Sequence, residues 1–209
     1  MSTRVLYLCE GSSDRGISLH IERIGAEEGV ATVLTVPDFN LLPVKPGSSV
    51  SAKLRAAKDL GGDYDLVVVH RDSDRDGPEA RRREIENAIA ESWPDLPHIP
   101  AIPVRMLEAW LLLDEQAIRQ VAQNPKGRVG LNLPKPASVE AIADPKAKLK
   151  DTLALASELQ GARLQKFQAR FSQNRARLLE MLDPNGAVSR VPSWATFTKD
   201  LREAFRGRG

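Results

Sequence analysis

Three aspartates at alternate positions, in the segment Asp72-Ser73-Asp74-Arg75-Asp76-Gly77, are the residues of this sequence with the most evident chemistry. With the glycine they fill positions 1, 3, 5 and 6 of an EF-hand calcium loop. Position twelve of that loop must supply a bidentate Glu, and here it is Arg83. The loop should also follow a helix, whereas residues 65–70 form a short β-branched run. The EF-hand therefore fails, leaving another kind of metal site or a solvated acidic turn.

A second acidic segment, Glu10-Gly11-Ser12-Ser13-Asp14, follows another short apolar run. Side chains that follow the strands of a parallel α/β sheet gather at the carboxyl edge of that sheet. If the two strands are neighbours, the carboxylates of Glu10, Asp72 and Asp74 meet at one point. A hard divalent cation with oxygen ligands, Mg²⁺ or Mn²⁺, would remove their mutual repulsion. The spacing therefore predicts a Mg²⁺ or Mn²⁺ site.

Short apolar runs alternate with helical periodicity along the first half of the chain. The expected strands are residues 4–9, 30–36 and 65–70, and the expected helices are residues 14–28, 51–60 and 78–92. Residues 98–104 carry two prolines and read as an edge strand or an extended connector. This order predicts βαβ units and a Rossmann-like α/β fold, a parallel sheet flanked by helices.

The second half of the chain is expected to be mainly helical. One helix is predicted over residues 106–123, a proline-containing loop over 124–137, and further helices over 145–159, 162–182 and 192–206. We therefore divide the chain near Asn124, into a metal-binding α/β domain (residues 1–123) and a basic helical region (residues 124–209).

Composition excludes several classes of protein. Hydrophobic residues make up 42% and charged residues 28%, which is ordinary for a globular protein. No segment reads as a signal peptide or a membrane span, so a cytoplasmic location without membrane contact is expected. The single cysteine excludes an internal disulfide, and three scattered histidines offer no zinc site.

Charge is distributed unevenly along the chain. Through His98 the chain has 12 Lys and Arg against 17 Asp and Glu, and beyond it 18 against 11. A basic half is compatible with polyanion binding, although solvated charged faces have the same composition.

Taken together, the two acidic segments resemble the TOPRIM domain of topoisomerases, DnaG-type primases and OLD-family nucleases. The resemblance covers about the first 105 residues, and its more specific part is Asp72-Ser73-Asp74-Arg75-Asp76-Gly77. It implies a Mg²⁺ site made by Glu10, Asp72 and Asp74. Asp76 would be an outer or second-metal ligand, and Glu10 the candidate general acid or base.

The rest of the chain departs from the larger members of that group. It lacks the DNA gate of a topoisomerase and the zinc-binding module of a primase. The segment 105–114, together with Asp144-Pro145-Lys146, instead resembles an uncharacterised TOPRIM-like bacterial family. Members of that family are often encoded beside AAA- or ABC-type ATPases in genome-defence neighbourhoods. The resemblance implies such an ATPase as a partner.

Five further residues are candidates for a place around the metal ligands or for phosphate binding: Asp14, Arg71, Arg75, Arg105 and Glu108. The arginines would neutralise charge that develops on phosphoryl oxygens. Glu108 lies in a very apolar segment, where an acid is costly unless it finds a cation or a donor. A local pair with Arg105 and a role at the metal site are the two open interpretations.

A cationic face is predicted on the helix over residues 162–182. It consists of Arg163, Lys166, Arg170 and Arg177, with no acid between the first and the last. Such a row suits phosphate contacts that position a nucleic acid, DNA or RNA, without reading its sequence. An ordinary amphipathic helix is the alternative.

These observations predict Mg²⁺- or Mn²⁺-dependent phosphodiester chemistry on nucleic acid, with hydrolysis by a nuclease as the leading hypothesis. The alternative is a non-catalytic subunit that binds metal and nucleic acid, or regulates, within an ATPase-containing complex. The chain has no phosphate-binding loop of the Walker type, so it should not hydrolyse ATP by itself.

Overall fold

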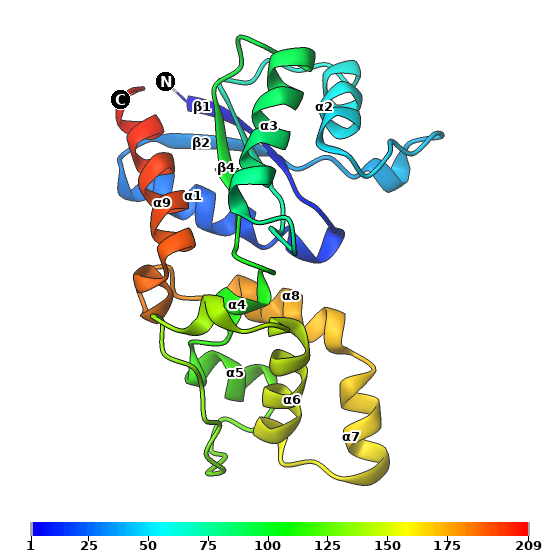
Figure 1. Ribbon diagram of the computed structural model, residues 1–209, viewed down its shortest axis with the longest axis vertical. Coiled ribbons are helices and arrows are strands. Elements are labelled where there is room, and N and C mark those ends of the chain that lie inside the picture. Colours follow the sequence, from blue (N-terminus) through cyan, green and yellow to red (C-terminus); the bar gives the residue numbers. More distant parts are fainter. Residues whose placement is uncertain (1, 209) are drawn as a thin grey trace.

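A parallel sheet organises the chain, as the sequence predicts (Figure 1). The computed structural model describes residues 2–208. Within them, β1 (Ser2–Leu8), β2 (Ala31–Thr35), β3 (Leu66–His70) and β4 (His98–Ala101) form one four-stranded sheet in the order β2-β1-β3-β4. Every pairing is parallel, and Leu8 of β1 lies opposite Val69 of β3. The strands after which the two acidic segments follow are therefore neighbours.

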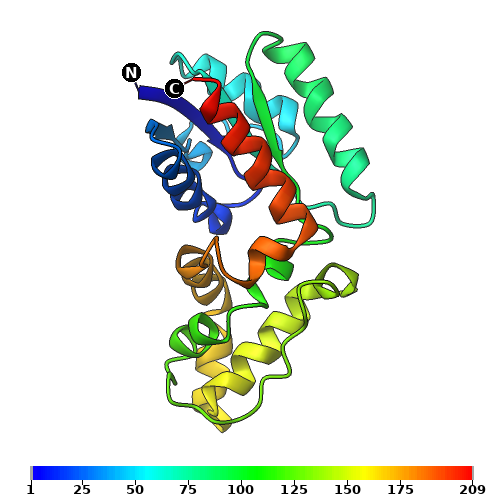
Figure 2. The ribbon, with the colours of Figure 1, turned by 90° about the vertical axis from the view of Figure 1, so that its left-hand side faces the viewer.

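Helices cover both faces of the sheet (Figures 1 and 2). One face packs on α1 (Ile17–Glu27) and α9 (Pro192–Arg206), and the other on α2 (Val50–Asp59) and α3 (Pro78–Ser92). Successive residues of a strand point to opposite faces, so Val68 joins the first core and Val67 the second. All five residues of β3 are buried for this reason.

The remaining helices form a second lobe below the carboxyl edge of the sheet (Figure 1). They are α4 (Glu108–Leu111), α5 (Glu115–Val121), α6 (Pro145–Ser157), α7 (Gly161–Gln168) and α8 (Phe171–Met181). After α8 the chain returns to the sheet, where α9 lies beside β4 and α1. The predicted boundary near Asn124 stays a prediction, but α5 before it and α6 after it pack together.

Two long helices expected from the sequence are each two shorter ones. The prediction over residues 106–123 was wrong because Asp114 caps a new helix, with its side chain accepting a hydrogen bond from the Ala117 N–H. The prediction over residues 162–182 was wrong because α7 stops at Gln168 and α8 starts at Phe171. Neither glycine nor proline marks this second break. The helices at 145–157 and 192–206 confirm the predictions over residues 145–159 and 192–206.

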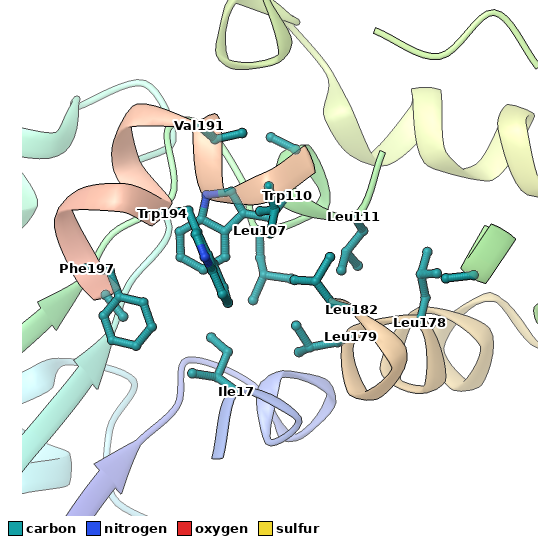
Figure 3. Close-up of a cluster of buried hydrophobic side chains, with 14 of the residues drawn as sticks. Ile17, Leu107, Trp110, Leu111, Leu178, Leu179, Leu182, Val191, Trp194 and Phe197 are labelled. Atoms are coloured by element: carbon teal, nitrogen blue, oxygen red, sulfur yellow. The ribbon is translucent and has the colours of Figure 1, made fainter. Parts of the chain in front are cut away.

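An aromatic cluster joins the lobe to the sheet domain (Figure 3). The rings of Trp110 in α4 and Trp194 in α9 meet edge to face, with centroids 4.9 Å apart, and both are fully buried. Leu179 of α8 and Ile17 of α1 complete the contact. Trp110 thus lies in the core, and one apolar core runs through both parts of the molecule.

None of the helices within residues 2–208 is both long enough and apolar enough to cross a membrane.

Candidate functional site

The carboxyl edge of β1 and β3 brings Glu10 and Asp72 together. The backbone N–H of Asp72 donates to Oε2 of Glu10 at 2.8 Å. The other oxygen of Glu10, Oε1, lies 3.1 Å from the Arg71 guanidinium. The chain crosses from β1 to β2 in one direction and from β3 to β4 in the other, so the topological switch point of the sheet lies between β1 and β3. Ligands of open α/β sheets bind at this position.

The loop after β3 is fastened to the segment that follows β4. The Ser73 N–H donates to the Pro103 carbonyl at 3.1 Å, and the Arg105 N–H donates to the Ser73 hydroxyl at 2.7 Å. Asp72 accepts from the Leu107 N–H through Oδ1 at 2.9 Å. The segment around Arg105 therefore fixes the backbone and the Asp72 side chain at this edge.

Asp74 and Asp76 do not join Glu10 and Asp72. Both contact Nη2 of Arg81, in the first turn of α3, at 3.4 Å for Asp74 and 2.8 Å for Asp76. Among residues 2–208, no group of three or more His, Cys, Asp or Glu side chains is placed to hold a metal ion. Of the three acids predicted to lie together, Glu10 and Asp72 do so and Asp74 does not.

Those two acids still fit a divalent cation of the magnesium type. Mg²⁺ in proteins is commonly held by one or two carboxylates, with waters and substrate phosphates as the other ligands. Glu10 and Asp72 are oxygen ligands at one edge, and their side chains are 32% and 18% exposed, so solvent reaches both. The donor set is compatible with Mg²⁺ or Mn²⁺ and offers no soft ligand.

The loop after β3, residues 72–77, carries the three aspartates, and we call it the acidic loop. An open hollow of about 510 Å³ lies beside it, and we call this the acidic-loop hollow. Its lining includes two of the predicted phosphate-binding residues, Arg75 and Arg105. The full lining is Asp74, Arg75, Asp76, Arg81, Arg105, Met106, Ala143 and Asp144. Arg71 lies elsewhere, beside Glu10 and Glu84.

A buried ion-pair network lies behind this edge, centred on Arg175 of α8. Its Nη1 lies 2.6 Å from Asp14 Oδ1 and its Nε lies 2.8 Å from Glu108 Oε1. All three side chains are buried. The predicted local pair of Glu108 with Arg105 is therefore wrong. Asp14 also accepts from the Gly11 N–H at 2.8 Å, so its carboxylate is fully used within the protein.

His70, the last residue of β3, links this network to Asp72. Its Nδ1 lies 3.6 Å from Asp14 and its Nε2 lies 3.4 Å from Asp72. Neither ring nitrogen has hydrogen-bonding geometry to any residue that the structure describes. Burial lowers the pKa of His70, but the neighbouring carboxylates of Asp72 and Asp14 outweigh it, so the pKa lies above its usual value. A protonated His70 would balance these two acids.

Burial has the opposite effect on the Asp14 carboxyl. It would raise the pKa of Asp14, but the positive charges of His70 and Arg175 and hydrogen bonds from Arg175 and Gly11 lower it further than burial raises it. Asp14 is thereby stabilised as a carboxylate inside the protein.

Comparison with protein families gives one match. The family described as a domain of unknown function, DUF4276, matches residues 8–202 of this chain. The chain belongs to the DUF4276 family. No curated protein and no solved structure matches it. The matched range includes Glu10, the acidic loop and Arg175, so the family assignment covers the whole edge described above.

The cationic residues predicted on one helix lie on two helices of the DUF4276 chain, around one hollow of about 480 Å³. We call it the basic hollow. Arg163 and Lys166 come from α7, Arg177 from α8, and Arg170 from the junction between them. The full lining is Gln123, Leu159, Arg163, Lys166, Phe167, Arg170, Gln173, Asn174 and Arg177. The four cations thus share a surface although the helix is broken.

Three residues of the site were missed from the sequence of this DUF4276 chain. Arg175 lies on the apolar stripe of α8, in line with Leu178 and Leu182, and a cation in such a stripe signals a buried acid. His70 is the polar end of a buried strand, which is a weaker signal. Arg81 is one of three consecutive arginines, and nothing in the pattern distinguishes it from its neighbours.

Proposed function

We propose that the chain catalyses Mg²⁺- or Mn²⁺-dependent phosphodiester hydrolysis on nucleic acid. The observation that carries the proposal is the 2.8 Å hydrogen bond from the Asp72 backbone N–H to the Glu10 carboxylate, between the ends of two neighbouring strands at the switch point of a parallel sheet. The TOPRIM-like spacing of these acids supports the same reaction class.

Glu10 and Asp72 would hold the cation. When bound, it would supply a water of lowered pKa and positive charge opposite the phosphate oxygens. Asp72 is oriented for this role by the Leu107 N–H, which occupies Oδ1 and leaves Oδ2 without a recorded partner among residues 2–208. Glu10 would take up or return a proton, with Arg71 at 3.1 Å holding its carboxylate in place.

The nucleic acid would lie along cationic surfaces of the molecule. The basic hollow supplies four Lys and Arg side chains that suit backbone phosphates, and such contacts position a strand without selecting its sequence. Arg75 and Arg105 in the acidic-loop hollow would contact phosphate closer to Asp72. This arrangement supports binding of DNA or RNA by charge.

The test is a cleavage assay on single- and double-stranded DNA and RNA with Mg²⁺ or Mn²⁺. Asp72→Asn should lower turnover by about two orders of magnitude or more, because it removes a ligand charge at the centre of the site. Its folding should survive, since Oδ1 still accepts from the Leu107 N–H. Asp59→Asn, at an exposed position at the end of α2, is the matched control. Equal cleavage by both variants would refute the assignment of Asp72.

A second candidate function is a non-catalytic subunit that binds metal and nucleic acid, or regulates, within an ATPase-containing complex. It is favoured by one observation, that Arg81 holds Asp74 and Asp76 away from the other acids. Under this alternative Mn²⁺ raises the thermal midpoint of the native chain, and no nucleic acid is cleaved. An AAA- or ABC-type ATPase is the proposed partner, and adding it would be the next experiment.

A further inference from the structure

Arg81 makes four contacts around the acidic loop, and they divide into two kinds. Nε donates to the Asp72 carbonyl at 3.1 Å, and Nη1 donates to Glu84 at 2.8 Å. Nη2 contacts only carboxylates of the acidic loop, Asp74 and Asp76. The first two contacts hold the guanidinium in place by themselves. The Nη2 group can therefore exchange its partners while the side chain stays where it is.

The two aspartates are the most exposed side chains of this cluster. Their side chains are 42% and 60% exposed, whereas the Arg81 side chain is only 16% exposed. Exposed ion pairs are weak, because water and salt screen them. A stronger anion for Nη2 would therefore displace Asp74 and Asp76 at small cost. Nη2 contacts Oδ2 of each aspartate, and its positive charge beside these carboxylates opposes the binding of a divalent cation to them.

The acidic-loop hollow admits such an anion. Arg75, Arg81 and Arg105 all line it, together with Asp74, Asp76 and Asp144. Three guanidinium groups around one opening suit a phosphate, whose oxygens accept forked hydrogen bonds from arginine. Asp74 and Arg105 lie side by side at this hollow, because the Asp74 N–H donates to the Arg105 carbonyl at 2.9 Å. Both residues have a left-handed backbone conformation, with φ of 47° and 65°.

We propose that Arg81 is a phosphate-binding residue that restrains Asp74 and Asp76 until a phosphodiester group enters the acidic-loop hollow. The phosphodiester takes the Nη2 contact, and the released carboxylates become available to the metal ion beside Asp72. Substrate and cation then bind with positive cooperativity, and each raises the affinity of the other by the same factor. The inference rests on the proposed function and names Arg81 as the residue that couples substrate to metal.

The experiment measures Mn²⁺ binding to the full chain by electron paramagnetic resonance of the free ion, without any turnover. Thymidylyl-thymidine serves as the phosphodiester probe, and its neutral methylphosphonate analogue as the uncharged control. In the native chain the charged probe should tighten Mn²⁺ binding about tenfold, and the analogue should leave it unchanged. These measurements on the native chain need no variant, so the inference can be tested even if a substitution impairs folding.

Arg81→Gln should bind Mn²⁺ about tenfold more tightly without any probe, because removing a competing cation frees the carboxylates. The probe should then give no further gain. Arg83→Gln is the matched control, since it removes the same charge from an exposed position of the same helix. It should behave like the native chain.

The outcomes separate this inference from the proposed function. A chain that shows the probe effect but never cleaves supports the coupling and removes the nuclease proposal. A chain that cleaves, yet binds Mn²⁺ equally with and without the probe, overturns the coupling. Equal Mn²⁺ affinity of native chain and Arg81→Gln also overturns it.

Discussion

Two arginines of this molecule each hold a cluster of carboxylates, Arg175 two and Arg81 three, and the burial of the two clusters differs. Arg175 pairs with Asp14 and Glu108 where all three side chains are buried. Arg81 pairs with Asp74 and Asp76, which are largely exposed. The closest contact is 2.6 Å in the Arg175 cluster and 2.8 Å in the Arg81 cluster, so burial is the larger difference between the two. Charges without water must stay paired, while charges in water can change partners.

This difference assigns a role to each cluster. The Arg175 cluster ties α8 of the lobe to the loop after β1 and to α4, three segments far apart in the sequence. It belongs to the framework behind the site. The Arg81 cluster lies beside an open hollow, where an incoming ligand can rearrange it.

The largest effect is expected from Arg175→Met. It leaves two buried carboxylates without their cation, which should lower the free energy of unfolding by about 3–5 kcal/mol. Urea unfolding followed by fluorescence of the buried Trp110 and Trp194 measures it. Arg177→Met, two residues along α8 and exposed, is the control and should change stability by less than about 0.5 kcal/mol.

A rescue variant sharpens this prediction. Adding Asp14→Asn and Glu108→Gln to Arg175→Met removes the stranded charges, so much of the lost stability should return. If the triple variant is no more stable than Arg175→Met alone, lost packing and not unpaired charge explains the effect.

The second effect concerns nucleic-acid affinity. Replacing Arg163, Lys166 and Arg177 together by Gln should weaken binding across all sequences and reduce the slope of log affinity against log salt by roughly one per lost phosphate contact. The stability of this triple variant should stay close to that of the native chain, since the three residues line an open hollow. Fluorescence anisotropy at several salt concentrations measures the slope. An unchanged slope would assign the basic hollow to structure alone.

The third effect is a pH dependence located in the buried cluster. His70 and Arg175 hold the folded pKa of the Asp14 carboxyl below its usual value, so the carboxylate contributes stability above the unfolded pKa and loses it as the pH falls through the folded pKa. The stability advantage of the native chain over Asp14→Asn should therefore be full at about pH 6 and shrink toward about pH 3. Urea unfolding at both pH values measures it. A difference that is the same at both pH values would show that ionisation of Asp14 does not contribute to the free energy of unfolding.

The smallest effect is expected from Arg81→Gln on stability. Solvent reaches Asp74, Asp76 and Glu84, so losing their ion pairs together with the hydrogen bond to the Asp72 carbonyl should lower the free energy of unfolding by only about 1 kcal/mol. The same urea experiment applies, with Arg83→Gln as reference. A loss as large as that of Arg175→Met would erase the contrast between the clusters and make Arg81 a framework residue.

The sequence predicts what depends on local pattern and on the parallel topology. The apolar runs before Glu10 and Asp72 are strands, and their adjacency brings these two acids to one edge. The sequence does not predict which charged side chains pair when they lie far apart along the chain. Arg175 lies 161 residues from Asp14 and 67 from Glu108, and Arg105 offers Glu108 a plausible local partner. Side-chain pairing of this kind is decided by the packing of α8, which no sequence periodicity reveals.

The return of α9 to the sheet has a consequence for biosynthesis. The first 101 residues contain every strand of the sheet, yet one face of that sheet also needs Phe197, Leu201 and Phe205 of α9. While the ribosome is still making the lobe, part of that apolar face has no cover and is exposed to aggregation. The nascent chain therefore completes its fold only after residues 192–206 have emerged from the ribosome. Until then we expect it to depend most on chaperones.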